Sequence, residues 1–421
     1  MIILLIYVAV FVLAFVLVRF LSRLLTRAVD LRSLKTVTFG DESAVRPDRR
    51  ASVISVLTIF LLWGAFTGSR WVPFHAPGPF VGDTRFTYTL ETPDGSRDDA
   101  TVFVRVFPVD ARAEAPTVEP GDGLARDDAA AVGAWRSVLI PVDRNDALTR
   151  AEGAKIVAID GHPVGPGESV DVPAGQVTLT GKGTPNFKPA QGWQMEPIWL
   201  PAPEAVVHRI VDIARDGYQN FTLAEHLGWS LFRVVAGFVL GALLGIPLGY
   251  AMGLSDWFRG WFDPIVEFMR PVPPLALIPL VIIWAGIGEV GKIILLFLAA
   301  LWIMTIAARA GVSGVGITKV HAAYSLGASK WQVLRHVIVP NSLPELFTGA
   351  RVAMGVCWGT VVAAELVAAE KGAGMMIMVA SRFQLTDIVL MGIILIGVIG
   401  YLIDILMRRA ERWLIPWKGR V

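Results

Sequence analysis

The stretch V-H-A-A-Y-S-L-G-A-S-K-W-Q-V-L-R-H-V-I-V-P occupies Val320–Pro340 and interrupts an otherwise apolar C-terminal half with polar residues. Ala322 and Ala323 are small enough to let another surface approach closely. Gly327 permits a sharp bend in the backbone. The run after this glycine is amphipathic, and Pro340 is expected to stop it. The stretch is therefore predicted to form a short helix–turn–helix between two longer helices.

The runs on either side of this stretch are long and apolar, and the whole chain shares their composition. Of the 421 residues, 54% are hydrophobic and only 18% are charged, against roughly 25% charged residues in ordinary soluble domains. Several runs reach about 20 residues, enough to cross a bilayer at a rise of about 1.5 Å per residue. The only cysteine, Cys357, lies inside one such run, which excludes an internal disulfide and a cysteine-based metal site. A polytopic membrane protein is predicted.

Basic residues fall on one side of the predicted spans. Seven Lys or Arg lie within residues 21–50, and further basic groups surround the helix–turn–helix and follow the last span. Because positively charged loops remain inside, these loops and the C-terminus are predicted to be cytoplasmic. Seven spans satisfy this arrangement. They are predicted over residues 1–20, 51–67, 231–254, 271–288, 292–311, 346–369 and 386–407.

Residues 69–199 have a different composition. Eighteen acidic and twelve basic side chains make this segment acidic, and its apolar runs shrink to the length of strands. Turn residues such as Pro93-Asp94-Gly95 and Asp160-Gly161 separate the runs. A small β-rich domain is predicted, and its acidity fits the outer side of the membrane. Strands are expected within residues 85–90, 101–108, 137–142, 155–160 and 176–180.

The stretch around Gly327 resembles the EAA loop, E-A-A-(3)-G-(9)-I-x-L-P, of the membrane subunits of ATP-binding-cassette (ABC) importers. H-A-A-(3)-G from His321 to Gly327 and the end at Ile338–Pro340 carry the resemblance. It extends over residues 200–421 and the span 51–67. R-V-V-A-G-F-V-L-G and R-P-V-P-P-L-A-L-I-P are similar to the nitrate/sulfonate/taurine branch, and the ending W-L-I-P-W-K-G-R-V is most similar to its taurine permeases.

This resemblance implies an all-α polytopic fold, the transmembrane domain of a type I ABC importer. It also implies a second permease subunit, expected to be another copy of this chain, two ATPase subunits and an extracytoplasmic substrate-binding protein. The chain has no Walker A loop on its cytoplasmic side. ATP and Mg²⁺ are therefore expected on the partner ATPase, and this chain is expected to be a transporter subunit rather than an enzyme. No cofactor, metal or nucleic acid is expected on it.

The resemblance further assigns contact with the ATPase to the helix–turn–helix. The residues concerned are His321, Ala322, Ala323, Tyr324, Ser325, Leu326, Gly327, Ala328, Ser329, Lys330 and Pro340. His321 departs from the motif, which has a glutamate there, so the coupling role is assigned chiefly to Ala322, Ala323 and Gly327.

Four residues are predicted to line the translocation path. Glu365 lies in the span 346–369, where a buried charge costs about 3 kcal/mol and should face a cavity or a partner. It either lines the path or braces a gate, or it makes a structural hydrogen bond, and Arg382 is one candidate partner. Trp358 lies at helical spacing from Glu365. Pro274 and Pro279 indicate mobile, broken backbone in the span 271–288, or simple helix packing.

The predicted organisation has five parts in a bacterial inner membrane. They are an extra N-terminal transmembrane helix (1–26), a basic cytoplasmic loop (27–50), the first core helix (51–68), an extracytoplasmic β-rich insert (69–199) and the permease core (200–421) with its EAA-like loop (315–340). The predicted function is ATP-driven import of a taurine-like sulfonate by alternating access. Nitrate or another small anion remains open. A membrane-anchored envelope sensor or scaffold, acting through residues 69–199, is the alternative from another class.

Overall fold

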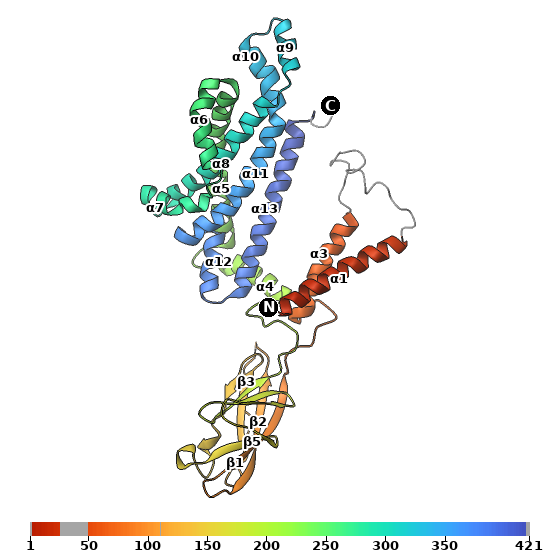
Figure 1. The fold of residues 1–421 in the computed structure, drawn as a ribbon, viewed down its shortest axis with the longest axis vertical. Coiled ribbons are helices and arrows are strands. Elements are labelled where there is room, and N and C mark those ends of the chain that lie inside the picture. The colour runs from red at the N-terminus through yellow and green to blue at the C-terminus, as the bar shows by residue number, and fades with distance from the viewer. Residues whose placement is uncertain (1, 26–48, 110, 418–421) are drawn as a thin grey trace. The chain divides into compact units, whose positions relative to one another are not determined.

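The computed structural model describes residues 2–25, 49–109 and 111–417. The predicted basic loop over residues 27–50 lies almost entirely outside the described residues. The chain divides into two compact units, residues 1–204 and 205–421. The first contains two helices and the named strands, and the second consists of helices (Figure 1).

Two apolar helices begin the first unit. They are α1 (Ile2–Leu25) and α3 (Arg49–Thr67). The helices meet near the start of α1 and the end of α3, where the ring centroids of Tyr7 and Phe66 are 4.1 Å apart. From that contact they diverge (Figure 1). Helix α3 coincides with the predicted span 51–67.

The rest of the first unit is built from two small sheets. One has the order β3-β2-β1-β5-β6 and the other β4-β9-β8-β7. All paired strands are antiparallel except β2 and β3, which are parallel. The strands are β1 (Gly82–Glu91), β2 (Arg97–Phe107), β3 (Asp128–Gly133), β4 (Val138–Leu139), β5 (Lys155–Ile159), β6 (His162–Pro163), β7 (Ser169–Val172), β8 (Gly175–Leu179) and β9 (Pro185–Pro189).

The alternation of apolar residues explains these strands. In β2, Val102, Val104 and Val106 are buried while their neighbours are not, as expected when one face of a strand covers a core. Phe86 of β1 and Phe187 of β9 stack with ring centroids 6.0 Å apart and join the two sheets. The predicted strands at 85–90, 101–108, 137–142, 155–160 and 176–180 overlap β1, β2, β4, β5 and β8, whereas β3, β6, β7 and β9 were not predicted.

The second unit contains ten α-helices and two short helical turns among the residues that the structure describes. The α-helices are α4 (Pro203–Asp216, shared with the end of the first unit), α5 (Leu223–Leu254), α6 (Asp256–Met269), α7 (Ile278–Ala285), α8 (Glu289–Ser313), α9 (Ile317–Ser325), α10 (Lys330–Val333), α11 (Val339–Ala368), α12 (Ala373–Arg382) and α13 (Thr386–Leu414). The turns treated below are η5 (Pro274–Leu277) and η6 (Leu334–Ile338).

Helices α5 and α8 pack closely because a row of glycines lies between them. Gly237, Gly241, Gly245 and Gly249 fall every fourth residue and are all buried. A Cβ atom at Gly237 would lie 2.4 Å from the Cβ of Leu296, far inside van der Waals contact. Small residues at this spacing let helix backbones approach each other in a membrane.

Five helices in the described ranges are long and apolar enough to cross a membrane. The pair α6 and η5–α7 bends by 93° at a short break and would add a sixth if it counts as one span. The apolar stretch of α1 over residues 5–20 is shorter than these. The predicted count of seven spans therefore stays a prediction.

The predicted span 271–288 contains the broken backbone that its prolines indicate. Residues 271–288 do not form one helix, because α7 has only eight residues, about 12 Å at 1.5 Å per residue. The prolines before it and Pro279 remove backbone donors, and Gly286, with φ +73°, ends the helix. The span predicted from residue 231 also begins earlier, at Leu223.

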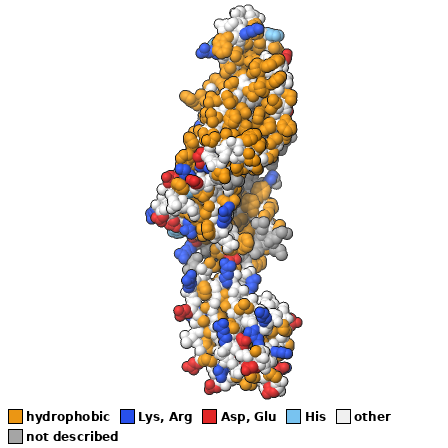
Figure 2. Space-filling model, turned by 90° about the vertical axis from the view of Figure 1, so that its left-hand side faces the viewer, with side chains coloured by type: hydrophobic (Ala, Val, Ile, Leu, Met, Phe, Trp, Pro, Cys, Tyr) orange, Lys and Arg blue, Asp and Glu red, His pale blue; other side chains and the backbone are white. Residues whose placement is uncertain are grey.

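The surfaces of the two units differ in chemistry. Hydrophobic side chains cover the long helices, whereas Lys, Arg, Asp and Glu are spread over the sheets (Figure 2). Leu243 on α5, Ile283 on α7 and Leu406 on α13 are among the exposed large hydrophobic residues. Side chains of this kind are expected where lipid replaces water as the solvent. The molecule is thus a mainly helical membrane-type fold that carries a sheet-rich insert.

Candidate functional site

The predicted helix–turn–helix is present as α9, a tight turn and α10. Gly327 lies in the turn with φ +81°, a left-handed conformation that favours glycine. Its N–H donates to the Tyr324 carbonyl (2.9 Å), and the Ala328 N–H donates to the Ala323 carbonyl (3.1 Å). Ser329 caps α10, and Gln332 completes the capping box. Local hydrogen bonds therefore define the turn, and a bond of 2.7 Å from Lys319 Nζ to Asn341 Oδ1 ties α9 to α11.

The turn presents apolar side chains to its surroundings. Leu326 is 88% exposed and Trp331 is 65% exposed, and Tyr324, two residues before Leu326, is also exposed. His321 and Ala322 are exposed on α9, and Ala323 is half-buried. An exposed apolar tip of this kind is typical of a surface that binds another protein. The predicted coupling residues are thus grouped at one end of the second unit.

The prediction that Pro340 stops the second helix is wrong. Helix α10 passes through the π-helical turn η6 into α11, and Pro340 lies in the first turn of α11. The π turn shifts the hydrogen-bond register, since the Val339 N–H donates to the Leu334 carbonyl. A proline is tolerated in the first turn of a helix, where its missing N–H is not needed. The helix therefore continues.

A cluster of buried charged groups lies toward the other end of α11. Glu365 follows Val339 by 26 residues, about 39 Å along a helix. Its Oε1 accepts a hydrogen bond from Nη1 of Arg233 on α5 at 2.6 Å. Arg233 also binds Glu289 of α8 through two bonds, Nε to Oε2 (2.5 Å) and Nη2 to Oε1 (2.7 Å). The side chains of Arg233 and Glu365 are fully buried.

The cluster is electrically balanced. Lys292 donates from Nζ to Oε1 of Glu289 at 3.0 Å, so two positive and two negative groups meet. The bidentate contact of Arg233 with Glu289 matches the planar fork of a guanidinium to a carboxylate. Because α5, α8 and α11 each contribute at least one of these groups, the cluster joins three long helices. In this conformation it links these helices to one another.

The segment between α11 and α12 closes over the cluster. The Gly374 N–H donates to Oε2 of Glu365 (2.9 Å), and the Ser230 hydroxyl donates to Oε1 (2.7 Å) while accepting from the Ala373 N–H (2.9 Å). A Cβ atom at Gly372 would lie 2.4 Å from the Glu365 carboxyl, and its φ of +143° also favours glycine. Every carboxylate oxygen of Glu365 is therefore satisfied within the protein.

His226 belongs to the same closure. Its Nδ1 accepts from the Gly372 N–H at 3.1 Å, so this nitrogen carries no proton. The proton of the neutral ring then lies on Nε2, which is 3.0 Å from the Tyr218 carbonyl. His226 links the start of α5 to the segment before α12.

The residues predicted to line a path do not come together. Glu365 lies in the cluster, and the prediction of Arg382 as its partner is wrong, because Arg233 binds it and Arg382 is exposed. Trp358 is buried on α11 and donates from Nε1 to the Ile396 carbonyl at 3.0 Å. Pro274 is half-buried and Pro279 is exposed. The role of these residues in transport stays a prediction.

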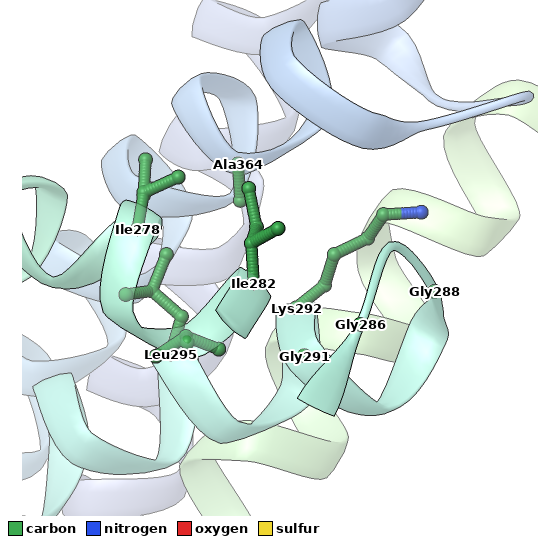
Figure 3. Close-up of a pocket in the computed structure, with 9 residues that line it drawn as sticks. Ile278, Ile282, Gly286, Gly288, Gly291, Lys292, Leu295 and Ala364 are labelled. Atoms are coloured by element: carbon green, nitrogen blue, oxygen red, sulfur yellow. The ribbon is translucent and has the colours of Figure 1, made fainter. Parts of the chain in front are cut away.

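A small cavity adjoins the cluster. It is lined by apolar residues of α7 and α8, by Ala364 and by the stem of Lys292, which runs past the Gly286–Gly288 turn (Figure 3). Its volume of about 20 Å³ is close to the space that one water molecule needs, about 15 Å³. This cavity is therefore too small for an organic substrate in this conformation.

The partners of Glu365 were missed by the sequence analysis. Arg233, Glu289 and Lys292 all lie within or at the edge of apolar runs, where an ionisable residue is rare and usually paired. That rule, applied to every charge in a span and not only to Glu365, would have identified all three. It would not have shown which groups pair with which.

One family model and three relatives bear on the family. Residues 237–416 match the family model described as binding-protein-dependent transport system inner membrane component. The taurine transport system permease protein TauC of Escherichia coli K12 is 47% identical over 228 residues, which cover 54% of this chain and 83% of TauC.

Two further relatives each match about half of this chain. The putative aliphatic sulfonates transport permease protein SsuC of Escherichia coli K12 is 40% identical, covering 54% of this chain and 84% of SsuC. The bicarbonate transport system permease protein CmpB of Synechococcus elongatus is 32% identical, covering 44% of this chain and 67% of CmpB. The chain therefore belongs to the family of inner membrane components of binding-protein-dependent transport systems, the ABC importer permeases, within the branch of the taurine and sulfonate permeases.

Proposed function

We propose that this chain is the permease subunit of an ATP-driven importer that moves a taurine-like sulfonate across the inner membrane by alternating access. The 47% identity to a taurine permease over 228 residues is the observation that carries the substrate class. The 32% identity to a bicarbonate permease supports a second candidate, a small inorganic anion such as bicarbonate or nitrate. A binding protein outside the membrane would make the first selection between them.

The tip formed by α9 and α10 is the proposed contact with the ATPase. It is exposed and apolar, and it lies in the part of the chain that matches the family model. Because α10 continues through η6 into α11, a displacement of the tip would be transmitted along one continuous helical segment. ATP and Mg²⁺ would bind to the partner ATPase, and two permease copies would surround the path.

The buried cluster is the proposed brace of the outer end of the path. Glu365 would hold α11 against α5 and α8 through Arg233, rather than contact the substrate itself. Its oxygens are fully used inside the protein, which supports a positioning role. In this arrangement α9–α10 and the C-terminus face the cytoplasm and residues 69–199 lie outside.

The insert is the proposed docking point for the binding protein. It has a hydrophobic core of its own, formed by residues such as Val102, Val104 and Phe187. A separate core also supports the alternative of an envelope sensor or scaffold. Deleting the insert separates these functions: loss of binding-protein-dependent uptake with retained ATPase binding supports docking, whereas function without any ATPase supports the sensor.

Uptake into proteoliposomes with the matching ATPase and binding protein tests the proposal. Taurine uptake that ethanesulfonate competes with and bicarbonate does not would support the sulfonate class, and the reverse order would support the inorganic anion. Gly327→Pro should abolish uptake, because proline cannot adopt the φ of +81° found there. Gly316→Ala is the matched control, since Gly316 has φ −58° and open space around it. Unchanged uptake by Gly327→Pro would contradict the coupling role.

A further inference from the structure

Two segments of the first unit connect helices to the sheets. Residues 68–81 join α3 to β1, and residues 190–202 join β9 to α4; together they are called the neck. Three carbonyls in the last turn of α3 accept hydrogen bonds of 2.9 or 3.0 Å from N–H groups of the neck. The bonds run from Ser69 to Gly64, from Ala76 to Ala65 and from Met195 to Phe66. Since carbonyls at the end of a helix have no partner within it, these bonds attach both segments to the end of α3.

Exposed aromatic side chains occur on both segments of the neck. Trp199 is 72% exposed and Trp193 is 61% exposed, and Trp71 and Phe74 are exposed as well. The backbone joins the two segments near these residues, since the Trp193 N–H donates to the Pro77 carbonyl at 2.7 Å. A group of exposed large apolar side chains marks a surface that binds a protein or a membrane.

The indole N–H groups distinguish three of these residues from a nearby tryptophan. Trp63 on α3 is half-buried, and its Nε1 donates to the Pro201 carbonyl of the neck at 2.9 Å. The indole N–H groups of Trp71, Trp193 and Trp199 donate to no other residue that the structure describes. A tryptophan of this kind suits surroundings that are apolar for its ring and supply acceptors for its N–H.

The end of α3 determines how deep the neck lies in a membrane. The apolar stretch of α3 has 18 residues, from Arg50 to Thr67, and extends about 27 Å, close to the hydrocarbon thickness of about 30 Å. Helix α3 therefore ends where the hydrocarbon meets the headgroups. Trp71 folds back against the span, because its ring stacks on Phe60 with centroids 6.3 Å apart. Phe60 precedes Thr67 by about 10 Å of helix.

We propose that the neck lies in the headgroup region of the leaflet at which α3 ends, and that Trp71, Trp193 and Trp199 bind its lipids. The lipid surface follows from the depth that α3 imposes and from the indole, whose ring suits the acyl chains and whose N–H suits the headgroups. The neck lies outside residues 237–416, which match the family model. The inference therefore does not depend on the transported substrate. This contact holds the insert at the membrane surface.

Spin labels in the full-length protein test this location. Cys357 is the only native cysteine, so a Cys357→Ala background accepts one nitroxide, at Trp193→Cys or at Trp199→Cys. Each variant leaves the other two tryptophans of the neck in place. In proteoliposomes, the collision rates of the label with oxygen, which concentrates in lipid, and with a water-soluble nickel complex are measured. Both labels should collide several-fold less with nickel, and more with oxygen, than a label at Arg97→Cys.

Arg97 is the control because it is exposed at the far end of the first hairpin. It lies opposite Glu91, nine residues along β1 from the neck, or about 30 Å at the rise of a strand. Nickel collisions at the two neck positions equal to those at Arg97→Cys would place the neck in water and overturn the proposal. Low collision rates with both reagents would show a protein partner on these tryptophans, which would overturn it as well.

The native indoles give a second measurement. Emission that is lost in Trp199→Phe comes from Trp199, and phosphatidylcholine brominated near the top of its acyl chains should quench most of it. Trp135→Phe is the matched control, because Trp135 packs against the hydrophobic core of the insert. Emission from Trp135 should change little with the brominated lipid. Equal quenching of the two residues, or no quenching of Trp199, would contradict lipid binding by the neck.

Discussion

Charged side chains are buried in both units, but the two units balance them differently. In the helices, Arg233 and Lys292 face Glu289 and Glu365. In the insert, Asp128 and Asp146 lie near each other beside Tyr88. The Tyr88 hydroxyl donates to Oδ1 of Asp146 at 2.8 Å. Oδ2 of each aspartate is buried without a hydrogen-bond partner among the described residues.

The difference determines how each cluster responds to pH. Burial raises the pKa of Asp128 to about 7, and the neighbouring charges of Asp146 and Asp127 contribute to the rise. Burial also raises the pKa of Asp146. Asp128 shows what burial does to the pKa of a carboxylate that no described cation contacts directly. In the helical cluster each carboxylate instead contacts a cation, so the aspartates of the insert are the group expected to titrate.

The largest effect is expected from removing the central cation of the brace. Arg233→Ala leaves Glu365 buried without its cation, which costs about 3–5 kcal/mol. The yield of folded protein and the thermal unfolding temperature in detergent should both fall. Arg382→Ala, at an exposed position, is the control and should change neither. A native-like unfolding temperature for Arg233→Ala would mean that the cluster does not brace the fold.

A smaller effect is expected from neutralising one acid of the brace. Glu365→Gln keeps the shape of the side chain and an oxygen acceptor, while Arg233 retains its two bonds to Glu289. The expected cost is about 1–3 kcal/mol, the range for a disturbed buried hydrogen bond. Thermal unfolding measures it. If Glu365→Gln lowered the free energy of unfolding as much as Arg233→Ala, the idea that the contact of Arg233 with Glu289 also stabilises the cluster would be wrong.

The insert should respond to pH in a direction set by Asp128. Since its pKa is higher in the folded state than its ordinary value, the folded insert holds the proton more tightly than the unfolded chain. The stabilisation is complete below the ordinary pKa and is lost as the pH rises through about 7. The protection factors of the β1 and β2 amides, which correct for the base-catalysed rise of intrinsic exchange with pH, should therefore be larger at about pH 5 than at about pH 8.

Substitution identifies the group responsible for this pH dependence. Asp128→Asn should slow exchange at the higher pH and change it little at the lower one, because the native side chain is already neutral there. Asp171→Asn, on an exposed position of β7, is the control. A pH profile that Asp128→Asn leaves unchanged would assign the dependence to another group.

The smallest effect on stability is expected at the tip formed by α9 and α10, where no charged side chain is buried. Leu326→Ser at the exposed tip should change the free energy of unfolding by no more than about 0.5 kcal/mol. It should nevertheless weaken association with the ATPase, measured by co-purification and by loss of coupled ATP hydrolysis. Leu139→Ser, 59% exposed on β4, is the matched control. Intact association of the Leu326→Ser variant would remove the tip from the coupling surface.

Structural features that depend on contacts between residues close together in the sequence were largely predictable. The turn at Gly327 and the cap at Ser329 depend on hydrogen bonds that reach at most five residues along the chain. Residue types and their spacing therefore identified the turn. The prediction for Pro340 was wrong because the effect of this proline depends on the π-helical turn η6 before it. Composition and residue spacing do not indicate that turn.

The sequence by itself determined that the chain is a membrane protein, where its β-rich insert lies and which turn forms the exposed tip, because apolar runs and turn residues act locally. Only the tertiary structure decided how the buried charges pair. Arg233 reaches Glu289 across 56 residues and Glu365 across 132 residues. These partners become neighbours only when α5, α8 and α11 pack together. The energy of a buried charge depends on that packing and not on the residues beside it in the chain.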